Sequence, residues 1–395
     1  MKRGGPGFLL ALLMAGVLSG ATLVMADDVG KFSRVLNQVE QLKQGTDQAQ
    51  PAKVPNGVAN QDQVRTREKS MAVVQFMDDS TMTVSPKSKV TIEEYMFDAD
   101  KGRARGSIKV MEGVVETIIP STEKLQQKDI QIRTTTAIAG IRGTKLITVA
   151  KPEGTVFYVL PDKKSTKPGK SKVRIRMYSA DTQPDSPAMR FVAERLQKKM
   201  DLRQIMDEGL EAKIDPCALV KAAILLGVDL NKLIVDFQQV CAQDPEFAKF
   251  CTPCIILKCT VEALRSLREV EVSEGQSGVL LKNLAPIVAN LKPGDVAIAE
   301  NLPTIGIEGQ LPNYPPTQDQ INQAKLPGEV SRIAEALIQN GADPTDMNKC
   351  KEGMGFAAVP AEALAYSPVA AAEGIQPGTP IGQGQQPTEP PASRF

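Results

Sequence analysis

The residues best suited to chemistry in this sequence are two closely spaced cysteines. Cys251-Thr252-Pro253-Cys254 separates two thiols by two residues. This is the spacing of a redox pair in which the first thiolate attacks a disulfide and the second resolves the mixed disulfide. One hypothesis is therefore a periplasmic thiol-disulfide oxidoreductase that uses Cys251 and Cys254.

The surrounding sequence favours a structural role for these cysteines. The chain has six cysteines, five of them within Cys217–Cys259, with no Trp before Cys251 and no alternation of strands and helices around it. In an exported chain an even number of crowded cysteines indicates disulfides that staple a small unit, and their pairing stays open at this stage. The spacing lacks a second Cys-x-x-Cys pair, so we expect no metal site and no cofactor. The disulfide candidates are Cys217, Cys241, Cys251, Cys254, Cys259 and Cys350.

The absence of histidine limits the possible chemistry further. With His 0, the chain has no Ser-His or Cys-His nucleophile, no His-ligated zinc, and no general base with an ordinary pKa near neutrality. We therefore expect no enzymatic activity. The formal net charge is only +1, so no overall field attracts nucleic acid, and we expect none as a partner.

A local run of basic residues is the clearest candidate for binding. It surrounds Pro168-Gly169 and continues into the strand that we expect next. Such a cluster suits the phosphates of lipopolysaccharide or of teichoic-type polymers, whereas the absence of interleaved aromatic residues favours an ordinary solvated loop. The expected partner is a cell-envelope polymer or outer-membrane component, bound by Lys163, Lys164, Lys167, Lys170, Lys172, Arg174 and Arg176.

The first residues have the order of a secretory signal peptide. Lys2 and Arg3 precede an apolar run that starts at Phe8, and Val24-Met25-Ala26 precede an acidic pair. This predicts a signal peptide over residues 1–26 and a periplasmic or secreted protein. A retained signal anchor is the alternative. No other stretch reaches about 18 apolar residues, so we expect no integral membrane span after cleavage.

Periodicity divides the rest of the chain. Residues 27–63 are expected to hold a short amphipathic helix at Asp28–Gln44 and then a linker. Residues 64–178 alternate with period 2 between turn residues, which predicts an all-β domain of antiparallel strands. The expected strands are Met71–Phe76, Thr81–Val84, Lys89–Tyr95, Ser107–Val110, Val114–Ile119, Ile130–Arg133, Lys145–Val149, Val156–Leu160 and Val173–Tyr178.

The centre of this β region is the pentapeptide Gly140-Ile141-Arg142-Gly143-Thr144. It is flanked by apolar-alternating runs, which predicts a strand, a tight corner and a second strand. Gly140 and Gly143 permit positive φ or a close approach of another backbone, and Arg142 between them is placed to hold carbonyls or a carboxylate. We interpret Gly140, Arg142, Gly143 and Thr144 as an architectural motif rather than a catalytic one.

These residues carry a resemblance to a known family. Arg65-Thr66, the turn Phe76–Ser80, Ser88, Gly106, the run Val110–Val114, and Ile132–Ala137 followed by the corner resemble the FecR domain of bacterial envelope proteins, over about Val64–Leu160. The sequence departs from the family in having Asp79 where Gly is usual, Thr135 where Pro is usual, and Leu146 where Phe is usual. The resemblance implies a β fold and a binding or structural role without enzymatic activity.

The founding members of that family are transmembrane regulators, which receive a signal from an outer-membrane receptor and act on a cytoplasmic sigma factor. Only about seven residues precede the apolar segment here, so we expect no sigma-binding module. The chain is more similar to the stand-alone exported members of the family.

After the β region the apolar period becomes helical. Residues 188–294 are expected to form a helical, cysteine-containing segment. Ala218–Asp229 and Arg332–Asp343 both end on Gly-x-Asp. This suggests two related helical hairpins and a protein-interaction surface, and the alternative is that two unrelated helices use the same capping residues. Residues 295–366 are rich in proline with one expected helix, and residues 367–395 read as a disordered tail.

The sequence as a whole predicts a multidomain α+β protein: an antiparallel, FecR-like all-β domain, then a disulfide-containing helical segment and a disordered Pro-rich tail. The expected function is that of a non-enzymatic exported envelope protein. Its β domain binds a cell-wall or outer-membrane component, and its helical segment engages a protein partner.

Overall fold

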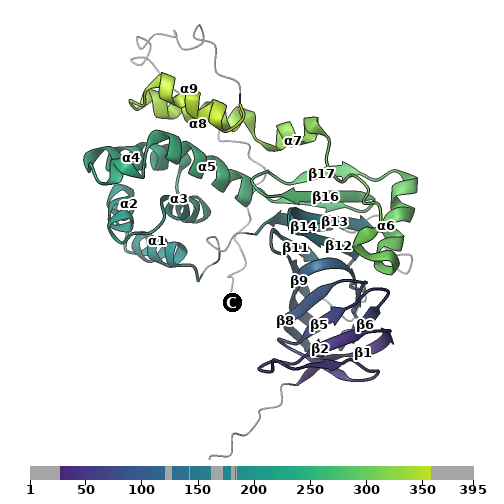
Figure 1. Cartoon of the computed structure of the whole chain (residues 1–395). Coiled ribbons are helices and arrows are strands. Elements are labelled where there is room, and N and C mark those ends of the chain that lie inside the picture. Colours follow the sequence, from purple (N-terminus) through teal and green to yellow (C-terminus); the bar gives the residue numbers. More distant parts are fainter. Residues whose placement is uncertain are drawn as a thin grey trace, which may run out of the picture. The chain divides into compact units, whose positions relative to one another are not determined.

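The computed structural model describes residues 27–120, 127–141, 143–161, 172–178, 183 and 185–356. The expected signal peptide and Pro-rich tail lie outside these residues. The chain divides into two compact units, each built from two segments. We call Met1–Ala180 with Leu264–Lys325 the β unit, and Asp181–Ala263 with Leu326–Phe395 the helical unit. The fold class is as predicted, with β structure first and a helical, disulfide-bonded unit after it (Figure 1).

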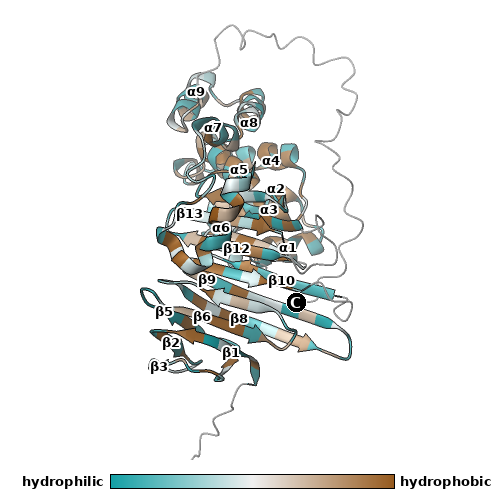
Figure 2. Cartoon of the chain, turned by 90° about the vertical axis from the view of Figure 1, so that its right-hand side faces the viewer, coloured by the Kyte–Doolittle hydropathy of each residue, from teal (hydrophilic) through white to brown (hydrophobic). Residues whose placement is uncertain are grey.

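The β unit is built from short strands with hydrophobic and polar residues in alternation (Figure 2). Two of the expected strands, β6 and β7, have the predicted bounds. Two others, Ser107–Val110 and Val114–Ile119, belong to the single strand β9, and the rest differ by a few residues. The strands are β1 (Asp28–Leu36), β2 (Val39–Leu42), β3 (Ala49–Pro51), β4 (Gly57–Ala59), β5 (Gln63–Thr66), β6 (Met71–Phe76), β7 (Thr81–Val84), β8 (Lys89–Asp98), β9 (Arg103–Ile118), β10 (Gln127–Arg133), β11 (Ala137–Ile141), β12 (Lys145–Lys151), β13 (Gly154–Leu160), β14 (Lys172–Met177), β15 (Val270–Ser273), β16 (Gln276–Leu281) and β17 (Ile287–Asn290).

The strands form two sheets that share β9. Sheet A has the order β4-β1-β6-β7-β9-β12-β13-β16-β17. Sheet B has the order β3-β2-β5-β8-β9-β10-β11-β14-β15. The pairing of β9 with β10 is parallel, and the other pairings are antiparallel. Apolar residues of both sheets, among them Phe32, Met82, Ile108 and Phe157, belong to one buried core.

Gly113 allows β9 to serve both sheets. The sequence predicted two separate strands, Ser107–Val110 and Val114–Ile119, on either side of Gly113, but the chain continues as a single bent strand. Gly113 has φ +94°, and a Cβ there would lie 2.1 Å from Oγ of Ser88. The same Oγ accepts a 2.9 Å hydrogen bond from the backbone N–H of Val114. The bend therefore needs glycine both for its backbone conformation and for space.

The expected helix at Asp28–Gln44 is wrong, because this segment forms β1 and β2. β1 pairs with β4 and β6, and the register shifts between Asp28 and Gly30 and again between Phe32 and Arg34. A β-bulge adds one residue to the strand. Core-facing residues that would otherwise be two positions apart in the sequence are then three positions apart. This is why Val29 and Phe32, both buried in the core, imitate helical periodicity. The expected linker likewise contains β3 and β4.

The β unit extends beyond residues 64–178 in the other direction as well. Residues 270–290 lie within the predicted helical segment but form β15, β16 and β17, which complete both sheets. Helix α6 (Pro293–Ile305) follows and packs on β9, β12 and β13 (Figure 1). The short 3-10 helix η3 (Gly306–Glu308) and helix α7 (Gln318–Ala324) end this part of the unit.

The helical unit consists of short helices with side-chain caps. The aspartates Asp201, Asp215, Asp229 and Asp343 each accept a hydrogen bond from a backbone N–H in the first turn of a helix. Helix α5 continues past the boundary of the unit at residue 263. The helices are α1 (Pro187–Gln197), α2 (Leu202–Glu211), α3 (Pro216–Leu225), α4 (Leu230–Gln243), η2 (Phe247–Lys249), α5 (Pro253–Leu267), α8 (Pro327–Gln339) and α9 (Pro344–Gly353).

The two Gly-x-Asp sequences end and start helices in the same way. Gly227 and Gly341 have φ +82° and +98°, and the aspartate two residues after each glycine caps the next helix. Beyond Gly294 the sequence predicted one helix, but most of α6 and all of α7, α8 and α9 lie there. Pro327 and Pro344 occupy first helical positions, where the missing N–H costs nothing, so these prolines start helices instead of breaking them. Among the described residues no helix is long and apolar enough to span a membrane.

Candidate functional site

The solvent side of sheet B carries the polar residues that we consider for binding. Along its strands, core residues such as Val90, Ile108 and Ile175 alternate with side chains on the opposite side of the sheet. We call this side the outer face. In register across neighbouring strands it contains Arg65, Lys89, Thr91, Ser107, Lys109, Gln131, Arg133, Ile138, Gly140, Lys172, Arg174 and Arg176.

A groove of about 390 Å³ lies on the outer face around Gly140, and we call it the Gly140 groove. Gly140 lies inside β11, opposite Gln131 of β10 and Arg174 of β14. Its φ is not positive, and a Cβ built at this position meets no atom within 4 Å. Glycine is therefore not needed here for a turn or for close packing. Its missing side chain opens the floor of the groove.

Three of the predicted basic residues line this groove, together with three carboxylates, those of Asp129, Glu269 and Glu271. Nζ of Lys172 lies 2.5 Å from Oε1 of Glu271, and Nη1 of Arg174 lies 3.8 Å from Oε1 of Glu269. Arg176 also lines the groove, and no carboxylate of the described residues forms an ion pair with it. The cations of β14 are therefore partly neutralised by the edge strand β15 and the residues just before it. The other four predicted cations, Lys163, Lys164, Lys167 and Lys170, lie outside the described residues.

A second ionic cluster borders the groove on β8, β9 and β10. Oε2 of Glu93 accepts a 2.7 Å hydrogen bond from the hydroxyl of Ser107 and a 3.0 Å hydrogen bond from Nη1 of Arg133. The Arg133 guanidinium also lies over the ring of Tyr178, 4.9 Å from its centroid. These contacts fix Arg133 in place on the outer face.

The corner that the sequence placed at Gly140–Thr144 is narrower than expected. β11 occupies Ala137–Ile141, so only Gly143, at φ +83°, has the predicted left-handed conformation. Thr144 is buried, and its carbonyl accepts a 3.1 Å hydrogen bond from the N–H of Ile119. Arg142 lies outside the described residues. The corner joins β11 of sheet B to β12 of sheet A.

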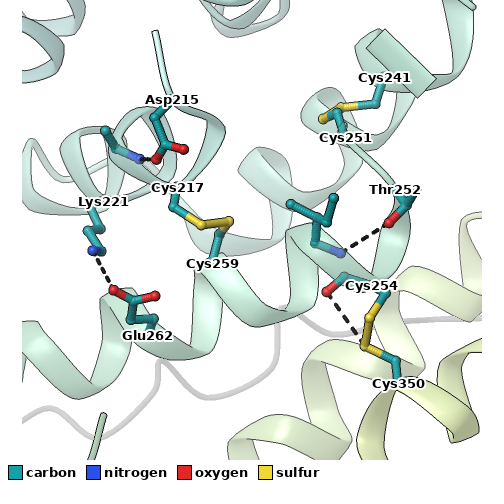
Figure 3. The surroundings of a disulfide bond; sticks show 12 residues. Asp215, Cys217, Lys221, Cys241, Cys251, Thr252, Cys254, Cys259, Glu262 and Cys350 are labelled. Carbon is teal, nitrogen blue, oxygen red and sulfur yellow. Dashed lines mark hydrogen bonds and ion pairs between the residues drawn. A yellow bond between two sulfur atoms is a disulfide. The ribbon is translucent and has the colours of Figure 1, made fainter. Parts of the chain in front are cut away.

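All six cysteines form disulfides, and all three bonds lie in the helical unit (Figure 3). Cys217 pairs with Cys259, Cys241 with Cys251, and Cys254 with Cys350. Cys251 and Cys254 are therefore bonded to different partners and not to each other. Cys254–Cys350 joins the start of α5 to α9 across a sequence separation of 96 residues.

An ion pair between a buried lysine and a partly exposed glutamate accompanies the Cys217–Cys259 bond. Nζ of Lys221 on α3 lies 2.7 Å from Oε1 of Glu262 on α5 (Figure 3), and the Lys221 side chain is only 5% exposed. The same two helices are thus joined by a covalent bond and by a charge-assisted hydrogen bond. This arrangement stabilises the helical unit and leaves no free thiol among its cysteines.

Sequence reasoning missed Arg65, Lys89 and Lys109 as members of the outer face. Each lies in a strand next to a fully buried residue of the core. Alternation alone would have placed them on one side of their strands, but the order of the strands, which brings them together, is not visible in the sequence.

Comparisons with known proteins identify one part of the chain. The FecR protein family model matches residues 62–161, so the β unit contains a FecR domain, as predicted. Two crystal structures of a putative anti-sigma factor from Parabacteroides distasonis ATCC 8503 are similar to the chain, with 14% and 13% sequence identity and TM-scores of 0.22 and 0.23. Each comparison covers 30% of this chain and 48% of the other, so the chain spans about half the length of those proteins. No curated protein matches the sequence.

Proposed function

We propose that this chain, which carries a FecR domain, is a non-enzymatic exported protein of the bacterial cell envelope. In this proposal the Gly140 groove of the β unit binds an anionic component of the cell wall or outer membrane. The observation that carries the proposal is Arg176, which lines an open groove without a carboxylate partner among the described residues.

The chemistry of the groove suits phosphate or carboxylate groups. A guanidinium donates two parallel hydrogen bonds to either group, so Arg174 and Arg176 are well suited to hold an anion. The ion pairs of Lys172 and Arg174 involve side chains that are about half exposed. Exposed pairs of this kind contribute little, from about 0 to 1 kcal/mol, so a multivalent anion can compete with the glutamates for them.

The cysteines support export and a structural role. Three disulfides are compatible with a protein that folds in an oxidising compartment. A thiol-disulfide oxidoreductase would need Cys251 and Cys254 to close on each other, and both have other partners. The proposal therefore excludes the redox alternative and assigns no catalytic residue.

We assign the helical unit to interaction with a protein partner. Leu225, Leu226 and Phe250 are large apolar side chains of this unit that are 36%, 36% and 43% exposed. Aromatic side chains such as Phe250 are enriched at protein interfaces. Helices α3 and α8, which end just before Gly227 and Gly341, supply rigid elements for such a surface.

Co-sedimentation with envelope fragments tests the assignment of the β unit. The purified protein is mixed with peptidoglycan sacculi or outer-membrane vesicles, and the bound fraction is measured at low and physiological salt. We expect Gly140→Leu, which fills the groove, and the double variant Arg174→Gln/Arg176→Gln to reduce the apparent affinity by about tenfold or more, which corresponds to about 1.4 kcal/mol.

The matched control is Lys43→Gln/Lys53→Gln, because both lysines are exposed in the β unit and the change removes the same charge. This control should bind like the unmodified protein. Equal binding by the groove variants and the unmodified protein would contradict the proposal. If the groove double variant and the control lost the same affinity, binding would be a general effect of positive charge and not a property of the Gly140 groove.

A further inference from the structure

We infer that the ligand of the β unit is a polymer whose repeated anionic groups occupy two grooves on the outer face, rather than a single anionic group. The inference rests on the proposed function and adds a second binding site to it. The second site is a groove of about 460 Å³ lined by Arg65, Arg67, Lys87 and Lys89, together with Glu68 and Glu112. We call it the Arg65 groove.

Two of its four cations have carboxylate partners, and two have none. Arg67 forms a 2.9 Å ion pair with Glu40, and Lys87 lies 2.7 Å from Glu68. By contrast, Nε of Arg65 donates only to the amide oxygen of Gln63, at 2.6 Å. No described carboxylate lies within ion-pair distance of Arg65 or of Lys89.

The β-sheet register places like charges opposite each other at two points on the outer face. Arg65 of β5 is directly opposite Lys89 of β8, and Lys109 of β9 is in register with Arg133 of β10. A like-charge pair in neighbouring strands is destabilising, by about 0.2–1 kcal/mol on the scale of cross-strand pairs. Glu93 neutralises Arg133, but Lys109 has no carboxylate partner in the described part of the chain. A bound anion would relieve the repulsion between Arg65 and Lys89 and would supply the missing partner of Lys109.

Lys109 and Arg133 lie between the two grooves. The strand order β5-β8-β9-β10-β11-β14 leads from the Arg65 groove across these two cations to the Gly140 groove. Neighbouring strands are about 4.8 Å apart, so the groove centres are separated by about 15–20 Å. A single phosphate or carboxylate cannot reach both sites, whereas a chain of anionic groups can follow the line of cations between them.

Simultaneous contact with both grooves predicts a strong dependence on ligand length. Once one end of a polymer is bound, its next anionic groups have a high effective concentration at the second groove, which raises the overall affinity without any new kind of contact. A ligand too short to span the grooves gains nothing from the second site. Length dependence therefore distinguishes a polymer from a small anion.

The test measures binding of inorganic tripolyphosphate, long-chain inorganic polyphosphate, and polygalacturonate by titration calorimetry. The variants are Arg65→Gln/Lys89→Gln for one groove and Arg174→Gln/Arg176→Gln for the other, with Lys43→Gln/Lys53→Gln as the charge-matched control. We expect each groove variant to weaken binding of a long polymer by about tenfold or more. The variant that combines all four substitutions should have the same affinity for the long polymer as for tripolyphosphate. Tighter binding of long-chain polyphosphate than of polygalacturonate would identify the preferred anionic group as phosphate. The opposite order would identify it as carboxylate.

The outcomes separate this inference from the proposed function. If Arg65→Gln/Lys89→Gln binds long polymers like the unmodified protein, and only the Gly140 groove variant loses affinity, the two-groove inference is wrong and the proposed function stands. If neither variant changes the affinity, both are wrong. Thermal melting provides the check on folding: removal of the Arg65 and Lys89 charges relieves a repulsion, so the melting temperature should not fall.

Discussion

The phenol of Tyr95 donates a 2.9 Å hydrogen bond to Oδ1 of Asp78, and both side chains are almost completely buried. The Tyr95 ring stacks on Phe76 with 4.0 Å between the centroids. A Cβ at Gly106 would come within 2.7 Å of the same ring. Burial, with the Asp78 charge as a second cause, raises the pKa of Tyr95 above its usual range. This contact links the β6–β7 turn to β8 inside the FecR domain.

We predict that Tyr95→Phe destabilises the β unit by about 1–3 kcal/mol, because the buried Asp78 carboxylate loses one of its donors. The N–H and hydroxyl of Ser80, at 3.1 and 2.8 Å, remain as donors. Denaturant unfolding measures the effect. Tyr178→Phe is the control, since the structure records no hydrogen bond from the Tyr178 hydroxyl within its described residues. Equal stability of the two variants would contradict this account.

Asp79 lies in the same turn and has φ +64°. It occupies a position where the FecR domain usually has Gly. A side chain in the left-handed region is strained, although Asp tolerates it better than most residues. We predict that Asp79→Gly raises the free energy of unfolding by up to about 1 kcal/mol, and that the β-branched Asp79→Val lowers it by about 1–2 kcal/mol. Thermal melting of the two variants is the measurement. A lower melting temperature for Asp79→Gly than for Asp79→Val would show that backbone strain in this turn does not control stability.

The two glycines of the corner motif should respond differently to the same change. Gly143→Ala is expected to cost about 1–2 kcal/mol, because Gly143 has φ +83° and alanine is strained there. Gly140→Ala should be neutral or slightly stabilising, because its Cβ enters open space in a strand. Parallel chemical denaturation of the two variants is the measurement. Equal destabilisation would mean that both glycines are needed for the backbone.

The disulfides should contribute unequally to the helical unit. Cys254–Cys350 closes a separation of 96 residues, and Cys241–Cys251 closes one of only 10. By loop-closure entropy, removal of the first costs about 4.7 kcal/mol and removal of the second about 2.7 kcal/mol. Replacing each pair with two alanines and measuring the unfolding of the helical unit compares them. A larger loss from the Cys241–Cys251 pair would contradict this order.

Period-2 alternation between turn residues was sufficient to predict most strands of the FecR domain. β6 and β7 have the predicted bounds, because each of their buried residues alternates with a more exposed one. The alternation pattern did not predict β1, because bulges change the spacing of its buried residues Val29 and Phe32. A short apolar run with irregular spacing does not distinguish a bulged strand from a helix, so that segment could not be assigned from its pattern alone.

The candidate site was only partly predictable for a different reason. Lys172, Arg174 and Arg176 stand out in the sequence because they are close together in the chain. Arg65, Lys89 and Lys109 join them only through the strand order of sheet B, in which segments far apart in sequence are neighbours. Likewise, the Cys251–Cys254 spacing suggested a pair, whereas helix packing brought Cys254 to Cys350.

Lysine footprinting tests the central claim most directly. The purified protein is acetylated with and without saturating envelope polymer, and the modification of each lysine is quantified by mass spectrometry. If the outer face of sheet B binds the polymer, Lys89, Lys109 and Lys172 become protected, and the exposed Lys43 and Lys53 react as before. Unchanged reactivity of Lys89, Lys109 and Lys172 under conditions where the polymer is bound would contradict the account.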